Sequence, residues 1–197
     1  MKNLILLIFI SFICMSAKAQ GEPQWFKDRI ANDVAKVYHT KSFIPHKDAW
    51  KGQPYKLIPL KELWADSDKE GTVYLNSSER QKYKLTFEKG RIWDAKGNEF
   101  DTRGINGAIF VMTKDGSIYA SRKEIANRFE HHSFVSGESV VCAGKLVIYN
   151  GHLKIIDDVS AQYPTKNHYP LTRVVSNLKS KGISFRKVKV VYYKDFN

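Results

Sequence analysis

Three glycine-containing turns, each between two β-type runs, most constrain what this chain of 197 residues can fold into. The clearest is Asn150-Gly151, because both residues tolerate positive φ and the pair is the strongest short signal of a hairpin. Lys89-Gly90 and Lys114-Asp115-Gly116 are interpreted on the same logic. The runs that these turns join are Tyr83 to Glu88 and Arg91 to Asp94, Ile109 to Thr113 and Ser117 to Ala120, and Lys145 to Tyr149 and His152 to Asp157.

The apolar spacing becomes helical near both ends of the chain. It predicts one helix over residues 25–38 and a second that begins near Pro170 and stops before Gly182. A last alternating strand follows, with Val188, Val190 and Tyr192 on one face. We therefore predict an α+β fold: an antiparallel β-sheet built from hairpins, flanked by an N-terminal and a C-terminal helix.

The first nineteen residues have the layout of a cleavable secretory signal peptide. An apolar stretch from Leu4 to Ile13 follows Lys2, and Ala17 and Ala19 occupy the −3 and −1 positions of a cleavage site. We predict cleavage after Ala19 and an exported bacterial protein that is secreted or periplasmic. The stretch of about ten residues is shorter than the roughly 20 that span a bilayer, and no transmembrane segment is predicted in the mature chain.

The chain is predicted to have three segments. Residues 1–19 form the signal peptide, residues 20–69 an N-terminal helix and irregular segment packed on the domain, and residues 70–197 a β-rich domain. Whether residues 20–69 form a separate subdomain stays open. Cys142 is the one cysteine after the signal peptide and lies in an apolar run, which predicts a buried structural thiol.

The charge of the chain favours acidic partners. Without the predicted signal peptide it has 30 basic and 20 acidic residues, a net charge of +10. Such a surplus suits anionic membrane surfaces, polyanions, nucleic acid or an acidic protein. The basic residues are spread along the chain, and the densest stretch, Lys179 to Lys189, is typical of a solvated face, so nucleic acid is disfavoured as a partner.

Four residues have side chains that could bind or polarise a substrate: His131, His132, Ser133 and Tyr163. The alternative is that His131 and Ser133 hydrogen-bond the backbone at the start of a strand while Phe134 fills the core. Asp157 and Asp158 are predicted to end a strand in solvent, because adjacent strand residues point to opposite faces. The six histidines lack the spacing of a metal site, and no phosphate or dinucleotide fingerprint occurs, so no metal or cofactor is predicted.

Ten short segments follow one another in an order and at a spacing that fit a known pattern. They are Tyr74 to Tyr83, Gly90, Asp101-Thr102, Ile109 to Met112, Asp115-Gly116, Tyr119, Phe129 to Gly137, Ala143-Gly144, Asn150-Gly151 and Ser160 to Pro164. Over about residues 70–190 the chain thus resembles the conserved domain of the plant IQ-motif-containing calmodulin-binding proteins. That domain is similar to C-terminal domains of some bacterial secreted or toxin-like proteins.

The chain departs from this pattern where the family usually reads Ser-Gly-His-Tyr before a proline. Ala161 and Gln162 replace the glycine and the histidine, so a catalytic role of that histidine does not transfer to Gln162. His168 lies six residues further on and, with Tyr119, is a candidate for ligand binding. The IQ motif itself is not evident, so the sequence does not support calmodulin binding.

Three functions stay open at this point. The first is an exported basic binding module for a protein or small molecule, without established catalysis. The second is a secreted toxin-type enzyme, similar to ADP-ribosyltransferases, for which NAD would be the cofactor. The third is binding to polyanions or a membrane surface through the positive charge, with an affinity that falls as salt is added.

Overall fold

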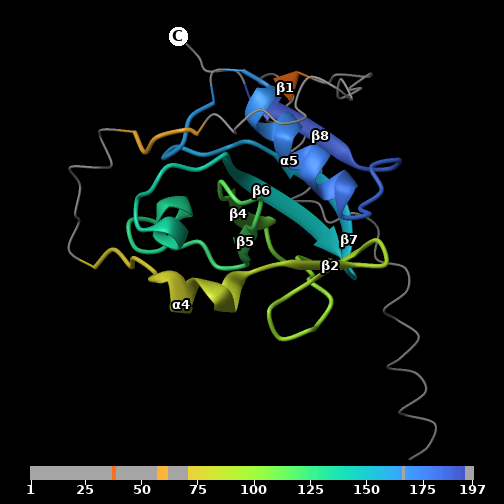
Figure 1. The fold of residues 1–197 in the computed structure, drawn as a ribbon, viewed down its shortest axis with the longest axis horizontal. Helices are drawn as coiled ribbons and strands as arrows, with labels where there is room; N and C mark the ends of the chain where they lie inside the picture. Colours follow the sequence, from red (N-terminus) through yellow and green to blue (C-terminus); the bar gives the residue numbers. More distant parts are fainter. Residues whose placement is uncertain (1–36, 39–56, 62–70, 166, 194–197) are drawn as a thin grey trace, which may run out of the picture. The chain divides into compact units, whose positions relative to one another are not determined.

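The computed structural model describes residues 37–38, 57–61, 71–165 and 167–193 (Figure 1). The predicted signal peptide lies outside these residues, as does most of the predicted N-terminal helix. The elements in chain order are β1 (Val37–Tyr38), α4 (Ser77–Arg80), η3 (Gln81–Tyr83), β2 (Thr86–Glu88), β3 (Arg91–Trp93), β4 (Ala108–Met112), β5 (Ile118–Ser121), η4 (His131–Val135), β6 (Cys142–Tyr149), β7 (His152–Asp157), α5 (Tyr169–Ser180) and β8 (Lys189–Tyr193).

Six strands form one sheet in the order β1-β8-β7-β6-β4-β5, and β2 and β3 form a separate pair. Neighbouring strands are antiparallel except β7 and β8, which are parallel. The prediction of a purely antiparallel sheet is wrong at this pair. The chain leaves β7, passes through α5 and returns in the same direction, and such a crossover places two strands in parallel. The coarse α+β description fits the described residues, in which strands predominate over helices.

The turn residues adopt the conformations that their positions require. Asn150 and Gly151 have φ values of 48° and 72°, between the paired residues Tyr149 and His152. Two left-handed residues in a two-residue loop match the twist of an antiparallel pair. The strands β2 and β3 are joined in the same way, by Lys89 and Gly90.

The strand β1 corrects the predicted N-terminal helix. Val37 pairs with Tyr193, and Tyr38 pairs with Tyr192, so the last two residues of the predicted helix over 25–38 are extended. Valine and tyrosine favour strands, and pairing with β8 overrides the local helical spacing. The other residues of that predicted helix lie outside the described part of the chain.

Both faces of the sheet are buried, as β4 shows. Phe110 and Met112 belong to a core cluster that includes the apolar face of α5, whereas Ile109 and Val111 belong to a second cluster that includes Phe134 of η4. Alternate residues of a strand point to opposite faces, so α5 covers one face and η4 the other. Within the described residues no helix is long and apolar enough to cross a membrane.

A short extended segment, residues 57–61, joins the second cluster from outside the hairpins. The backbone of Ile58 exchanges hydrogen bonds with Val140, and the N–H of Lys61 donates to the carbonyl of Gln162 at 3.0 Å. Ile58 and Leu60 pack against the second cluster. We call residues 57–61 the N-terminal strap.

Candidate functional site

Three of the four residues with candidate chemistry lie together in η4, one turn of 3-10 helix. The turn begins after Glu130, whose N–H donates to the hydroxyl of Ser133 at 3.1 Å. The N–H of Ser133 in turn donates to the carbonyl of Glu130 at 3.0 Å. The Ser133 side chain is fully buried and closes the start of this turn. Its hydroxyl therefore has a structural partner.

The ring of His131 is held at both nitrogens. Nε2 lies 3.0 Å from the carbonyl oxygen of Gly144, and Nδ1 lies 3.1 Å from the side-chain oxygen Oε1 of Gln162. A backbone carbonyl only accepts, so Nε2 carries the proton. In the neutral ring Nδ1 then accepts, so the Gln162 amide is turned to place its NH₂ group, in the position drawn for Oε1, toward the ring. Position 162 is thus a partner of His131 in the core.

Burial keeps this histidine neutral. Desolvation lowers the pKa of His131, and the hydrogen bonds with Gly144 and Gln162 oppose this effect without reversing it. The pKa of His132 is also lowered, by burial and by the neighbouring His131. The His132 ring meets Tyr74 edge to face, with ring centroids 5.6 Å apart. Both imidazoles therefore pack as neutral groups.

Tyr163 enters the second cluster from the loop after β7. Its side chain is completely buried, and its hydroxyl donates to the carbonyl of Glu138 at 2.9 Å. Burial raises the pKa of this phenol. The Ser160 hydroxyl accepts from the Tyr163 N–H at 3.1 Å and fixes the loop. Tyr163 thus follows Gln162 directly, beside the partner of His131.

The two residues considered for ligand binding lie in different places. Tyr119 is buried in β5, in the second cluster, and the Arg80 guanidinium lies 5.4 Å from its ring centroid. His168 precedes α5 and packs beside Tyr169 and Tyr192, on the side of the α5 cluster. The structure therefore brings His131, Ser133 and Tyr163 into one region, and places His168 elsewhere.

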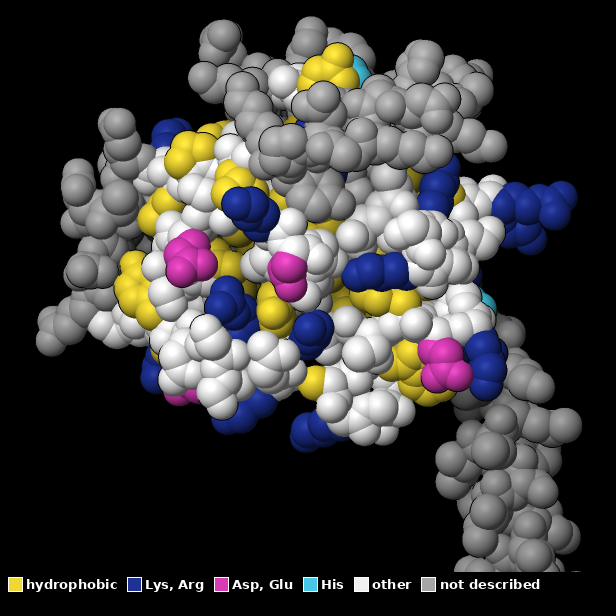
Figure 2. Space-filling model, viewed as in Figure 1, with side chains coloured by type: hydrophobic (Ala, Val, Ile, Leu, Met, Phe, Trp, Pro, Cys, Tyr) yellow, Lys and Arg dark blue, Asp and Glu magenta, His cyan; other side chains and the backbone are white. Residues whose placement is uncertain are grey.

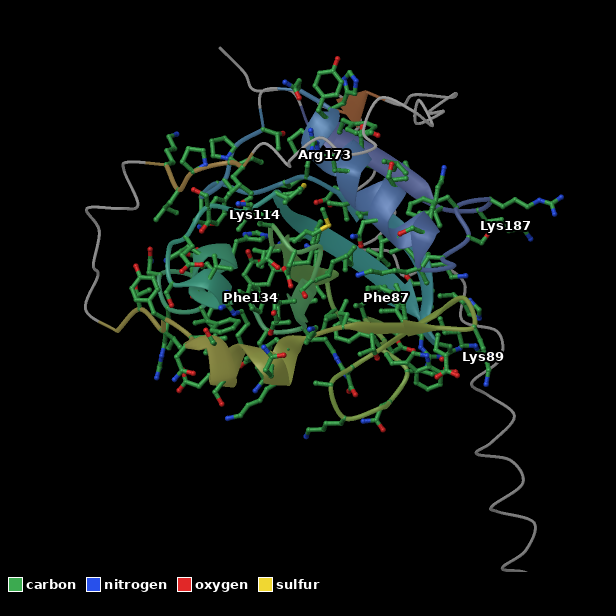
Figure 3. All side chains as sticks on the ribbon, in the orientation of Figure 1. Phe87, Lys89, Lys114, Phe134, Arg173 and Lys187 are labelled. Atoms are coloured by element: carbon green, nitrogen blue, oxygen red, sulfur yellow. The ribbon has the colours of Figure 1, made fainter. Side chains whose placement is uncertain are left out.

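The labelled residues in Figure 3 show the two sides of the sheet. Phe134 lies in η4, in the second cluster, while Arg173 lies on α5 and Phe87 on β2. Phe134 makes edge-to-face contacts with Phe129 and Tyr83, at centroid distances of 5.3 Å and 5.6 Å. The surroundings of η4 are therefore a packed aromatic cluster.

The end of β7 corrects another prediction. Asp157 and Asp158, predicted to lie in solvent, are both buried. Asp157 accepts from the N–H of Lys145 at 2.8 Å, and Asp158 accepts from the Thr165 hydroxyl at 2.8 Å. These bonds offset the cost of burying the carboxylates. The signal in the sequence was a strand that ends in two acids beside a polar loop, but solvent exposure was the simpler interpretation.

Gly144 and Cys142 complete the described surroundings of the site. A Cβ on Gly144 would lie 2.0 Å from the carbonyl oxygen of Asp157, so only glycine fits there. Cys142 is buried and unpaired with any other cysteine, which confirms the predicted buried thiol, and burial raises its pKa well above the usual range. Among the described residues, no group of three or more His, Cys, Asp or Glu could hold a metal ion.

Comparisons with known proteins support the resemblance to the plant IQ-motif-containing proteins. Residues 79–169 match the family described as the IQ motif-containing protein middle domain. In Arabidopsis thaliana, the chain is 28% identical over 120 residues to IQ domain-containing protein IQM5, 34% over 94 residues to IQM3 and 30% over 118 residues to IQM1. These alignments cover 60%, 46% and 59% of this chain. They cover only 24%, 20% and 24% of the relatives. No solved structure matches the chain.

These relatives correct three predictions. They are plant IQ domain-containing proteins, so the predicted bacterial and toxin-like character is wrong, and so is the predicted secreted or periplasmic location. That location rested on the pattern of residues 1–19, which lie outside the described residues. The interpretation that calmodulin binding lacks support is also wrong, because the match is to a family of IQ-motif proteins. The part of the resemblance that holds is the plant part: residues 79–169 are similar to the middle domain of the IQ-motif proteins.

Proposed function

We propose that the described domain is a protein-interaction module without a catalytic site of its own, and that it binds calmodulin. The bonding of the His131 ring supports the first half. A general base needs a nitrogen within reach of a substrate proton. Both nitrogens of this ring instead face groups of the domain, the Gly144 carbonyl and the Gln162 amide. The Ser133 hydroxyl and the Tyr163 hydroxyl are likewise bonded inside the domain.

The second half rests on the similarity to the IQ-motif proteins and on charge. The chain has a net charge of +12, and the calcium loops of calmodulin are built from aspartate and glutamate. The sequence contains no Ile-Gln pair. The apolar face of α5 is buried, so this helix does not offer the exposed amphipathic face of a usual calmodulin target. Within the described residues, calmodulin would therefore contact the surface of the folded domain and not α5 as an exposed helix.

A titration of fluorescently labelled calmodulin with the full chain tests this function, once with calcium and once with a calcium chelator. We expect saturable binding in at least one condition. A Ser133→Ala variant should bind with unchanged affinity while its unfolding free energy falls by about 1 kcal/mol, because it loses one hydrogen bond to the backbone. The proposal fails if calmodulin does not bind in either condition, or if Ser133→Ala abolishes binding while the fold is intact by circular dichroism.

A further inference from the structure

The C-terminal part of the chain carries charge of one sign. Residues 167–193 contain six basic residues and no acidic one. Arg173 is buried, while the other five lie at or beyond the last turn of α5. These five are Lys179, Lys181, Arg186, Lys187 and Lys189.

Two turns from other parts of the chain add lysines to this place. A Cβ on Gly90 would lie 3.6 Å from the carbonyl oxygen of Gly182, so the turn that holds Lys89 lies beside the end of α5. The Lys181 ammonium donates to the carbonyl of Gly116 at 2.9 Å, which brings the turn that holds Lys114 to the same helix. We define the α5-end surface by Lys89, Lys114, Lys179, Lys181, Arg186 and Lys187.

Figure 3 agrees with this grouping for Lys89 and Lys187, while its label for Lys114 lies apart from both. Figure 3 shows Lys89 and Lys187 at the same edge of the described domain, near the end of α5. Figure 2 shows basic side chains spread over the whole visible face of the described part, with fewer acidic ones among them. Two acids lie next to the surface in the sequence. Glu88 forms an exposed ion pair with Lys89 at 3.1 Å, and Asp115 accepts hydrogen bonds from Thr113 and Ser117.

Helix stability accounts for only part of this charge. Cations in the last turn of a helix are stabilised by its dipole, by about 0.3–1 kcal/mol each. Lys179 and Lys181 fit that description. Lys89 and Lys114 come from separate turns, and Arg186 and Lys187 follow the helix, so the dipole does not require them there. A surface that gathers cations from three segments needs another explanation.

The surface suits carboxylates better than nucleic acid or lipid. The Lys181 ammonium lies 4.9 Å from the Phe87 ring centroid, and the Lys179 ammonium lies 5.6 Å from that of Phe185. These rings are covered by the protein's own cations, so they offer no free face for a base to stack on. Among the exposed large apolar residues of the described part, Tyr74 and Ile125 belong to other segments and Tyr169 lies at the opposite end of α5, so they provide no membrane anchor here.

We propose that the α5-end surface docks an acidic segment of a protein partner, with its carboxylates against Lys89, Lys179 and Lys187. This inference rests on the proposed function, since it says where and by what chemistry the module binds. The three lysines are exposed and come from two separate segments, and the turn that holds Lys89 lies beside the end of α5.

A charge-reversal experiment on the full chain tests the proposal. The test variant is Lys89→Glu/Lys179→Glu/Lys187→Glu. The matched control is Lys61→Glu/Lys96→Glu/Lys123→Glu, which changes the net charge equally at exposed lysines elsewhere. The probes are calmodulin, a labelled peptide rich in glutamate, a single-stranded oligonucleotide, and vesicles that contain phosphatidylserine. Thermal unfolding of all variants checks the fold.

The expected result is that the test variant binds calmodulin and the acidic peptide at least about tenfold more weakly than the wild type, while the control changes by less than about threefold. Equal weakening in both variants would overturn the proposal, because net charge alone would explain binding. The proposal also fails if the oligonucleotide or the vesicles bind more tightly than both acidic probes at the same salt.

Unchanged calmodulin binding in the test variant would overturn the docking surface and leave the proposed function intact. If calmodulin does not bind but the peptide binds through these lysines, the surface stands and calmodulin as partner fails.

Discussion

Among single residues, Gly144 leaves no room for a side chain. Its hypothetical Cβ would lie 2.0 Å from the Asp157 oxygen and 2.7 Å from the carbonyl carbon, and backbone atoms cannot move aside as side chains do. We expect Gly144→Ala to lower the unfolding free energy by about 3 kcal/mol, the upper end of the usual cost of overpacking. Urea denaturation would measure this change. Because the Gly144 carbonyl also bonds His131, the shift should disturb η4.

Gly97→Ala is the matched control for that substitution. Gly97 has a φ of +79° and no atom within 4 Å of a hypothetical Cβ. The variant is therefore destabilised only by the left-handed backbone conformation of an alanine, and not by a clash. Its expected cost is about 1 kcal/mol. Equal losses in the two variants would mean that the close approach at Gly144 does not matter.

The two buried histidines predict how stability depends on pH. Their pKa values are lowered in the folded state from the usual 6.5. Below about pH 6.5 the unfolded chain therefore binds more protons than the folded domain does. Their contribution is therefore complete above about pH 6.5 and is lost as pH falls toward the lowered pKa values. We expect the urea midpoint to fall between about pH 7 and about pH 5.5, with a limit of about 1.4 kcal/mol per pH unit for each histidine.

A His131→Gln/His132→Gln variant should show a flatter pH dependence over the same interval, whatever its absolute stability. The control is His152→Gln, because His152 is exposed on β7, and its replacement should leave the slope as it is. A wild-type midpoint that is constant across the interval would contradict the prediction.

Among elements, the sequence predicts local features better than distant pairings. The Asn150-Gly151 turn needs only its own two residues and the flanking runs, so its conformation follows from local chemistry. The parallel pairing of β7 with β8 depends on how α5 packs, which no local pattern contains. The same holds for the site: η4 places His131 beside Gln162, 31 residues later, and only the folded chain shows that contact.

The N-terminal strap gives a prediction about one such distant pairing. The N–H of Ile58 donates to the Val140 carbonyl at 2.6 Å, and Val140 donates back at 3.0 Å. Ile58→Pro removes the donor and should lower the unfolding free energy by about 1–3 kcal/mol, because a buried acceptor loses its partner. Ile58→Val keeps the bond and should cost only about 1 kcal/mol. If the two variants have the same urea midpoint, the strap does not stabilise the domain.

For the whole molecule, charge separates what the sequence can predict from what it cannot. The net charge of +12 is visible in the composition and favours an acidic partner. Its distribution is not visible there, because Lys89 and Lys114 lie far along the chain from Lys179 and Lys187. Only the packing of two turns against α5 gathers them. The location of the chain, in contrast, was predicted wrongly from a local pattern, and similarity to plant IQ domain-containing proteins corrects it.

The last prediction concerns the rate of association between the whole chain and an acidic partner. Opposite net charges attract over distances set by the Debye length, about 30 Å at 0.01 M salt and about 10 Å at 0.1 M. Salt therefore slows the encounter more than it speeds dissociation of the contacts once formed. In stopped-flow mixing with calmodulin, we expect the association rate constant to fall at least about tenfold between about 10 mM and about 300 mM NaCl, and the dissociation rate constant to change less than about threefold.

The variant Lys89→Glu/Lys179→Glu/Lys187→Glu should lose more of this salt dependence than Lys61→Glu/Lys96→Glu/Lys123→Glu, because the field that guides the partner is strongest where the cations are gathered. An association rate constant that is independent of salt would mean that charge does not guide the encounter.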